Sequence, residues 1–181
     1  MSFGIEVAPR LHVGSTADYA SLESMWDAGL ANQDRWAVVH AAKEPYHRDF
    51  VGYVERAAPK DHPEYLFARR DNRLALNLID VADVKYMPEP LWAAAIAFIT
   101  EHHDAGREVL IHCNQGGSRA PSLALLWLSF SDPEWGLLKF ADAEERFRGL
   151  YPAYSPAAGP RDFVANNWGI PFDNLAAAET F

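Results

Sequence analysis

One stretch, residues 108–122, constrains the fold of this chain more than any other. Residues 109–111 (Val-Leu-Ile) are a short apolar run, which is typical of a buried strand. Five residues then separate Cys113 from Arg119, and residues 123–128 predict a helix that is apolar on nearly every face and therefore lies inside the protein. Strand, tight loop and helix start gather main-chain N–H groups around one small volume, which suits an anion of the size of phosphate.

The residues of this loop combine a nucleophile with groups that can hold an oxyanion. A thiol beside a helix N-terminus and a cation loses its proton readily, and the thiolate is the nucleophilic form. The planar guanidinium of Arg119 can bind two phosphoryl oxygens at once, which a lysine cannot do. Gly116 and Gly117 allow a sharp turn and a close approach to a ligand. The alternative, a core thiol at Cys113 and a surface charge at Arg119, leaves both glycines unexplained.

His112-Cys113, five residues and Arg119 together resemble the loop of cysteine-dependent protein phosphatases, most closely the compact dual-specificity type. Residues 11–15 (Leu-His-Val-Gly-Ser) resemble the opening of that family, and residues 152–163 resemble its C-terminal segment, which leads into a closing helix. Sulfurtransferases and arsenate reductases also use thiolate loops and stay as alternatives. The resemblance covers about residues 10–168 of one expected domain, residues 1–181, with an irregular tail over residues 169–181.

The resemblance implies a role for each residue of the loop. Cys113 would be the nucleophile, Arg119 would bind the phosphoryl group, and His112 would support the loop. No metal or other cofactor is implied. The remaining phosphate-binding positions would be Asn114, Gln115, Gly116, Gly117 and Ser118.

The family places an aspartic acid after the strand that precedes the central helix, where it protonates the leaving oxygen and later activates water. Asp80 fits this position best, because residues 78–80 (Leu-Ile-Asp) end a predicted strand. Asp83 is the reserve candidate for the general acid. Either aspartate could instead only cap a turn.

The match departs from the family at Ala120, where serine or threonine usually follows the arginine. Because that hydroxyl helps the cysteine to leave in the second step, hydrolysis of the phosphocysteine is expected to be slow. Two classes of function therefore stay open. One is a phosphatase, and the other is a phosphate-binding module that captures phosphorylated partners with little turnover.

The substrate class follows from the residues between Cys113 and Arg119, which include no lysine. Lipid phosphatases of the superfamily tend to carry basic residues there, so phosphotyrosine and phosphoserine or phosphothreonine in proteins are favoured. Small phosphomonoesters, inositol phosphates and RNA 5′-phosphates are not excluded. The sequence does not give the depth of the pocket, the natural substrate or the oligomeric state.

Composition limits the cellular setting and the partners. The chain has 181 residues, a net charge of −9 and one cysteine, which excludes an intramolecular disulfide and fits a reducing compartment. The N-terminus lacks the pattern of a signal peptide, and no apolar run is long enough for a membrane span, so we expect a cytoplasmic protein. The negative charge argues against nonspecific nucleic-acid binding.

Charge is distributed unevenly along the chain. Residues 43–73 hold seven lysines and arginines against six aspartates and glutamates, whereas the rest of the chain is strongly acidic. This segment could face an anionic substrate, but a solvated loop of mixed charges is the interpretation that we favour. It also lacks hydrophobic periodicity, and since long structureless loops are uncommon in compact domains, we expect a small helix around residues 50–57.

The hydrophobic pattern predicts an α/β fold with a central, mostly parallel sheet flanked by helices. Ligands of such sheets bind beyond the carboxyl ends of the strands, where Cys113 and Asp80 would both lie. The expected strands cover residues 5–14 with a break at Pro9, 36–42, 73–80 and 109–111. The expected helices cover residues 18–31, a stretch opened by Pro88 and Pro90 and ended by Gly106, residues 123–128, a stretch from Pro133 to Leu150, and a closing helix.

Overall fold

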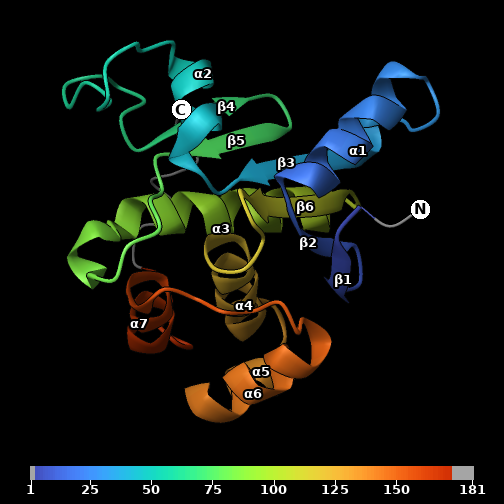
Figure 1. Ribbon diagram of the computed structural model, residues 1–181. Coiled ribbons are helices and arrows are strands. Elements are labelled where there is room, and N and C mark those ends of the chain that lie inside the picture. The colour runs from blue at the N-terminus through green and yellow to red at the C-terminus, as the bar shows by residue number, and fades with distance from the viewer. Residues whose placement is uncertain (1–2, 173–181) are drawn as a thin grey trace.

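The computed structural model of this protein describes residues 3–172 and has a six-stranded sheet at its centre (Figure 1). The strand order is β1-β2-β6-β3-β5-β4. The β2–β6, β6–β3 and β3–β5 pairs are parallel, and the two edge pairs are antiparallel. This confirms the predicted α/β fold with a mostly parallel central sheet. The strands are β1 (Ile5–Ala8), β2 (Leu11–Ser15), β3 (Trp36–His40), β4 (Phe67–Arg70), β5 (Arg73–Leu76) and β6 (Glu108–Cys113).

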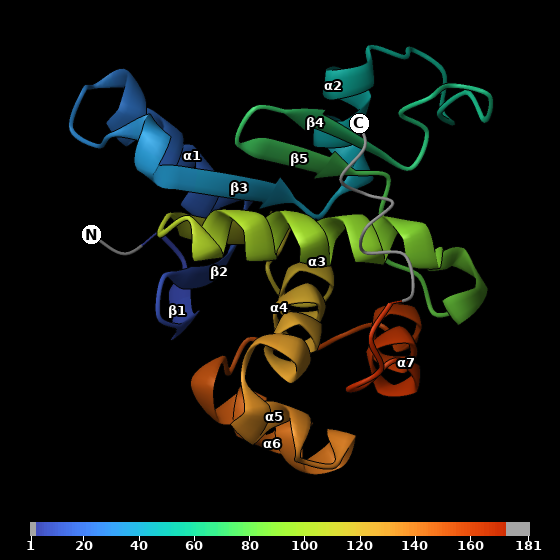
Figure 2. The ribbon, with the colours of Figure 1, turned by 180° about the vertical axis from the view of Figure 1, so that it is seen from behind.

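Helices cover both faces of the sheet (Figures 1 and 2). The first two lie on one face, and the other five lie on the opposite face. The α-helices are α1 (Thr16–Asp27), α2 (Arg48–Val51), α3 (Glu89–Asp104), α4 (Arg119–Ser131), α5 (Pro133–Gly136), α6 (Phe140–Leu150) and α7 (Ala158–Asn166). Three short helical turns join them, η1 (Gln33–Arg35), η2 (Lys43–His47) and η3 (Val84–Tyr86).

Side chains of the central strands alternate between two hydrophobic clusters. Val38 and Leu110 pack against Tyr19 and Leu22 of α1. Their neighbours in sequence point to the opposite face and join the main core with the apolar side chains of α3 and α4. Because both faces are covered, these strands are apolar along their whole length rather than at every second residue.

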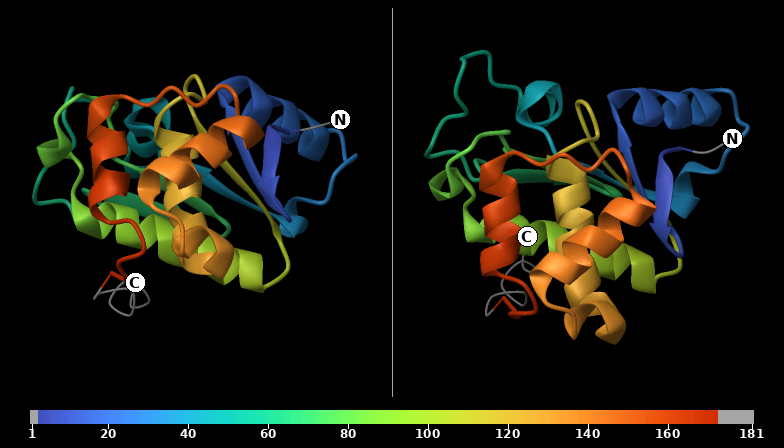
Figure 3. Two further views of the ribbon diagram at one scale, coloured as in Figure 1. Left: turned by 90° about the horizontal axis from the view of Figure 1, so that it is seen from below. Right: turned by 60° about the horizontal axis from the view of Figure 1, so that its bottom comes forward.

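Helix α4 is buried on every side, as its sequence predicts. Residues 119–129 are all buried, and the helix lies between α7 and α6 (Figure 3). Its N-terminus meets the end of β6, so the sheet and this helix together fix the loop over residues 114–118. That loop lies at the carboxyl edge of the parallel strands, which is the usual ligand position in such folds.

The segment between β3 and β5 differs from the prediction. The expected small helix is present but lies earlier in the chain. Helix α2 spans Arg48–Val51, directly after η2, rather than residues 50–57, and Gly52 is its C-cap. Gly52 has φ +83°, a left-handed conformation that closes a helix. Strand β4 was not predicted. It pairs with β5 through main-chain hydrogen bonds, for which no hydrophobic alternation is needed.

Several predicted boundaries also change. Helix α1 ends at Asp27 rather than at residue 31, and β5 ends at Leu76, so residues 77–80 continue without a partner strand. The helix expected from Pro133 to Leu150 is two helices, α5 and α6, and Leu137 between them is 87% exposed rather than buried. Of the expected irregular tail, residues 170–172 are neither helix nor strand, and residues 173–181 lie outside the described part. Across residues 3–172, no helix has the length and apolar character needed to cross a membrane.

Candidate active site

A pocket of 460 Å³ lies where β6 ends and α4 begins. Cys113 is the last residue of β6 and Arg119 is the first residue of α4, and both line this pocket. Cys113 is 2% exposed, so its thiol lies at the base of the hollow rather than on the surface. The structure thus brings together two groups that are six positions apart in the sequence. The other lining residues are Asp80, Asn114, Gln115, Gly117, Ser118, Ala153 and Ser155.

Residues outside the loop between Cys113 and Arg119 donate hydrogen bonds to the carbonyl groups of that loop. The Tyr151 hydroxyl donates to the carbonyl of Gly116 at 3.0 Å, and the main-chain N–H of Ser155 donates to the carbonyl of Gly117 at 2.8 Å. In contrast, the main-chain N–H groups of residues 115–118 donate to no acceptor within residues 3–172. Free N–H groups in such a loop can hold an anion.

Gly116 is required by the geometry of this loop. Its φ is +75°, and a β-carbon there would lie 3.0 Å from the Gly14 carbonyl oxygen and 3.0 Å from the Tyr151 hydroxyl. A side chain would therefore be strained in its backbone and crowded by the main chain of β2. The sequence argument for a close turn at this position agrees with the structure.

The guanidinium of Arg119 is 9% exposed and is held at both terminal nitrogens. One donates to the carbonyl of Leu78 at 3.2 Å, and the other donates to Asn114 Oδ1 at 2.7 Å. Its Nε is buried and makes no hydrogen bond within the described residues, and the nearest carboxylate oxygen, Asp80 Oδ2, is 4.0 Å away. A buried cationic donor without an acceptor is costly, so an anion in the pocket would relieve that cost.

Asp80 lies on the pocket and Asp83 does not. The Ser118 hydroxyl donates to Asp80 Oδ1 at 2.6 Å, which fixes the carboxylate beside the loop. Asp83 instead caps η3 and pairs with Lys85 at 2.7 Å, and this partner lowers the pKa of the Asp83 carboxyl. Of the two sequence candidates for the general acid, Asp80 alone is brought close to Cys113 and Arg119.

His112 points away from the pocket to the other face of the sheet. Its ring stacks on Tyr19 with centroids 4.8 Å apart, and its Nε2 lies 2.6 Å from Nδ1 of His40. Both imidazoles are almost fully buried. Burial lowers the pKa of His112 to about 3 and lowers the pKa of His40 well below its usual value. The pair is therefore neutral and lies on the face of the sheet opposite to the pocket.

Three features of the site were not found from the sequence. His40 contacts His112 directly. Burial raises the pKa of Tyr151 to about 12, so its hydroxyl stays protonated and can donate to the loop. Ala153 and Ser155 complete the pocket wall. The only available signal was the resemblance of residues 152–163 to a family segment, because nothing local shows that this segment returns to the loop.

Ala120 is buried at the start of α4 and provides no hydroxyl at the position where the family usually has one. Within residues 3–172, no group of three or more histidine, cysteine, aspartate or glutamate side chains is arranged to hold a metal ion. The site as described consists of a thiol, a guanidinium, a carboxylate and main-chain N–H groups.

No protein-family model matches this sequence, and no curated protein matches it in sequence. Solved structures do match it in fold. That of DUSP15 has a TM-score of 0.62 at 16% identity and covers 99% of this chain and 98% of that chain. The Cydia pomonella PTP-2 phosphatase has a TM-score of 0.61 at 16% identity, covering 92% of this chain and 91% of its own. The human tyrosine phosphatase-like serine/threonine/tyrosine-interacting protein has a TM-score of 0.59 at 15% identity, covering 90% of this chain and 93% of its own.

Proposed function

We propose that this chain, which has the compact fold of the dual-specificity phosphatases, hydrolyses phosphomonoesters through a phosphocysteine intermediate at Cys113. The observation that carries the proposal is the pocket itself. It contains a buried thiol, the unpartnered Nε of Arg119 and a loop whose N–H groups at residues 115–118 have no acceptor within the described chain. These groups are the parts needed to hold a phosphoryl group against a nucleophile.

In the first step, the Cys113 thiolate attacks phosphorus and the bond to the leaving oxygen breaks. Asp80 donates a proton to that oxygen, which leaves as an alcohol or phenol. Charge on the equatorial oxygens is balanced by Arg119 and the loop N–H groups. The Ser118 hydroxyl, which donates to Asp80 Oδ1 at 2.6 Å, keeps the carboxylate at the pocket.

In the second step, water attacks the phosphocysteine and Asp80 accepts the proton of that water. The phosphorus–sulfur bond breaks, inorganic phosphate forms, and sulfur leaves as the thiolate. Because Ala120 offers no hydroxyl to assist this departure, we propose that the second step limits the overall rate.

The proposed substrates are phosphotyrosine and phosphoserine or phosphothreonine in proteins, since the loop carries no lysine for additional phosphates. A single cysteine that must stay reduced fits a cytoplasmic location. A second candidate function is capture of phosphorylated partners with little turnover. It is favoured by Ala120, and one structural neighbour is named as tyrosine phosphatase-like and interacting.

The test is hydrolysis of an aryl phosphate in the presence of EDTA, with vanadate as inhibitor. We expect metal-independent hydrolysis that vanadate blocks, a phosphorylated Cys113 in rapidly quenched samples, and a Cys113→Ser variant that binds phosphate but is inactive. Activity that persists in Cys113→Ser would overturn the mechanism. Tight binding of phosphopeptides without formation of phosphocysteine would instead support the capture function.

A further inference from the structure

A second hollow, of 440 Å³, lies next to the candidate active site and is lined by three lysines. The lysines come from three separate parts of the chain, so the fold and not the sequence gathers them. Lys43 begins η2, Lys60 lies in the segment between α2 and β4, and Lys85 lies in η3. We call this hollow the lysine groove. Its remaining lining residues are Ala57, Ala58, Tyr65, Leu66, Asn77, Ile79, Tyr86 and Pro88.

No carboxylate lines the lysine groove, although the whole chain has a net charge of −9. Two of the lysines have anionic neighbours on the rim. Lys43 lies 3.6 Å from Glu44, which is itself held by Arg48, and Lys85 pairs with Asp83. Lys60 is exposed and makes no ion pair within residues 3–172. The groove therefore presents at least one unpaired positive charge to a ligand.

The lysine groove and the pocket at Cys113 share a wall. Ile79 lines the groove and its neighbour Asp80 lines the pocket, so the two linings are one residue apart, or about 3.8 Å between α-carbons. The carbonyl of Leu78 accepts from the Lys43 main-chain N–H at 3.0 Å and from Arg119 at 3.2 Å. An extended peptide advances about 6.6 Å over two residues, so the residues within two positions of a phosphorylated residue bound in the pocket are the ones that can approach the neighbouring groove.

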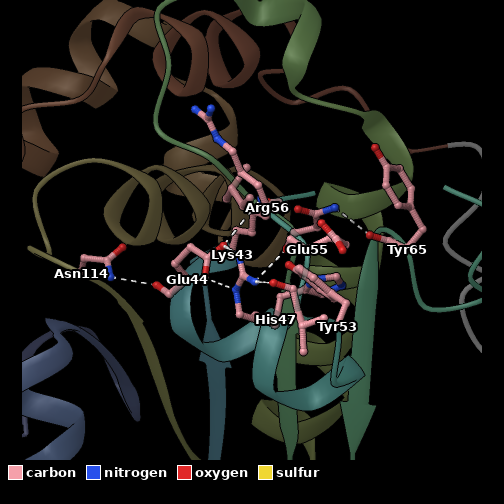
Figure 4. A network of polar contacts seen from close by, with 12 residues as sticks. Lys43, Glu44, His47, Tyr53, Glu55, Arg56, Tyr65 and Asn114 are labelled. Carbon is pink, nitrogen blue, oxygen red and sulfur yellow. Dashed lines mark hydrogen bonds and ion pairs between the residues drawn. The ribbon is translucent and has the colours of Figure 1, made fainter. Parts of the chain in front are cut away.

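The far wall of the groove is held by polar contacts that reach the phosphate-binding loop (Figure 4). The Lys43 ammonium donates to the carbonyl of Arg56, and Arg48 donates to the carbonyl of Glu55 at 2.7 Å. On the side of the loop, Asn114 Nδ2 donates to the carbonyl of Glu44 at 2.9 Å. Since Asn114 also accepts from Arg119, the same amide connects the groove wall to the guanidinium. These contacts connect the groove, through Lys43, to the loop at Cys113.

From this arrangement we propose that the lysine groove binds the carboxylate of an acidic side chain one or two residues away from the phosphorylated residue of a protein substrate. The inference rests on the function proposed above and adds a sequence preference to it. Tyr65, Leu66 and Tyr86 would contact the aliphatic part of the peptide beside the charge. We assign a peptide rather than an inositol polyphosphate because these side chains make much of the groove apolar.

The test compares phosphotyrosine peptides that differ only in Glu or Gln at one or two residues on either side of the phosphotyrosine. We expect a preference for Glu of about twofold to fivefold in kcat/KM, arising from a lower KM, which corresponds to one exposed ion pair. Lys60→Glu should abolish or reverse this preference while aryl phosphate hydrolysis stays unchanged. The preference should also weaken in high salt, because exposed charges are screened.

The matched control is Lys139→Glu, which makes the same charge change at an exposed position just before α6. It should leave the Glu-over-Gln preference intact. If wild-type protein shows no preference, or if Lys60→Glu and Lys139→Glu alter it equally, the inference is overturned. It is also overturned if an inositol polyphosphate is the better substrate and Lys60→Glu impairs that substrate most.

Failure of the proposed function is distinguishable from failure of this inference. If the protein does not hydrolyse aryl phosphates at all, the phosphatase proposal fails, but the assignment of the groove is still open to test. The same Glu and Gln phosphopeptides are then compared by binding affinity, with Lys60→Glu and Lys139→Glu as before. Equal affinity of wild-type protein for both peptides would overturn the assignment of the groove.

Discussion

Replacing Asp80 by asparagine isolates the proton transfer from the geometry of the site. Asparagine has the same shape, and its amide oxygen can still accept from the Ser118 hydroxyl, which now donates to Asp80 Oδ1 at 2.6 Å. The loop is therefore expected to keep its conformation. What is lost is the acidic proton for the leaving oxygen and the base for the attacking water, so the variant tests chemistry rather than folding.

Two effects of Asp80→Asn oppose each other, and their sizes decide the outcome. Loss of general acid catalysis costs about 10²- to 10⁴-fold in rate. Loss of a negative charge 4.0 Å from Arg119 Nε should favour binding of an anionic substrate. Because the Asp80 side chain is 38% exposed, water screens that charge, and this gain is limited to roughly 1 kcal/mol, or about fivefold in KM. We therefore expect a kcat at least about 100-fold lower, with KM unchanged or lower.

The assay is steady-state hydrolysis of phosphotyrosine and of aryl phosphates whose leaving groups differ in pKa. The loss in Asp80→Asn is compared in kcat/KM, which reports the first step, in which the leaving group departs. It should be largest for the most basic leaving groups, which depend most on a proton, and the basic limb of the pH profile of kcat/KM should disappear. Asp83→Asn is the matched control, since Asp83 pairs with Lys85 outside the pocket. An equal loss for all leaving groups, or a larger loss in Asp83→Asn, would refute the assignment.

Two further predictions test the loop and the core. Gly116→Ala should lower activity at least about tenfold and lower the free energy of unfolding by roughly 1–2 kcal/mol, because its φ is +75° and the new β-carbon meets the main chain of Gly14. The control is Gly149→Ala, because the space around Gly149 is open. Burial lowers the pKa of His102 to about 4, so stability should fall between pH 6.5 and 4, by about 3 kcal/mol from this residue. Urea denaturation that is independent of pH, or equally dependent in His102→Gln, would contradict this.

The sign of that pH dependence follows from the neutral state of the histidine. Between pH 6.5 and 4 the unfolded chain binds a proton on His102, whereas the folded protein does not. Stability is therefore complete above pH 6.5 and is lost as the pH falls toward 4. Arg107 donates to Nδ1 of this ring at 2.8 Å, which favours the neutral form further.

Most of the framework could be predicted because it is encoded locally. The apolar run of β6, the all-round apolar character of α4 and the glycines between them predict strand, loop and helix without knowledge of the rest of the chain. Pro90 near the start of α3 and Gly106 after its end mark that helix in the same way. The position of Asp80 beside Cys113 was also expected, because the carboxyl ends of parallel strands meet at one edge. Its role as the general acid stays a prediction.

The errors lie where the structure depends on contacts with distant residues. Strand β4 has no hydrophobic alternation and forms only because β5 offers it a hydrogen-bonding partner. The break between α5 and α6 was missed since the apolar Leu137 fits a helical pattern, yet the fold leaves it in solvent. The expected helix around residues 50–57 ends instead at Gly52, where the chain turns to cover the lysine groove.

By itself, the sequence determined the strand and the helix on either side of one short loop and placed a thiol, two glycines and a guanidinium there. Only the tertiary structure decided what surrounds that loop, from the His40–His112 contact and the Tyr151 hydroxyl to the three lysines next to Asp80. The reason is physical. The seven residues from Cys113 to Arg119 stay close together because the chain connects them directly. Side chains many residues apart meet only when the packing of the sheet and its helices brings them together.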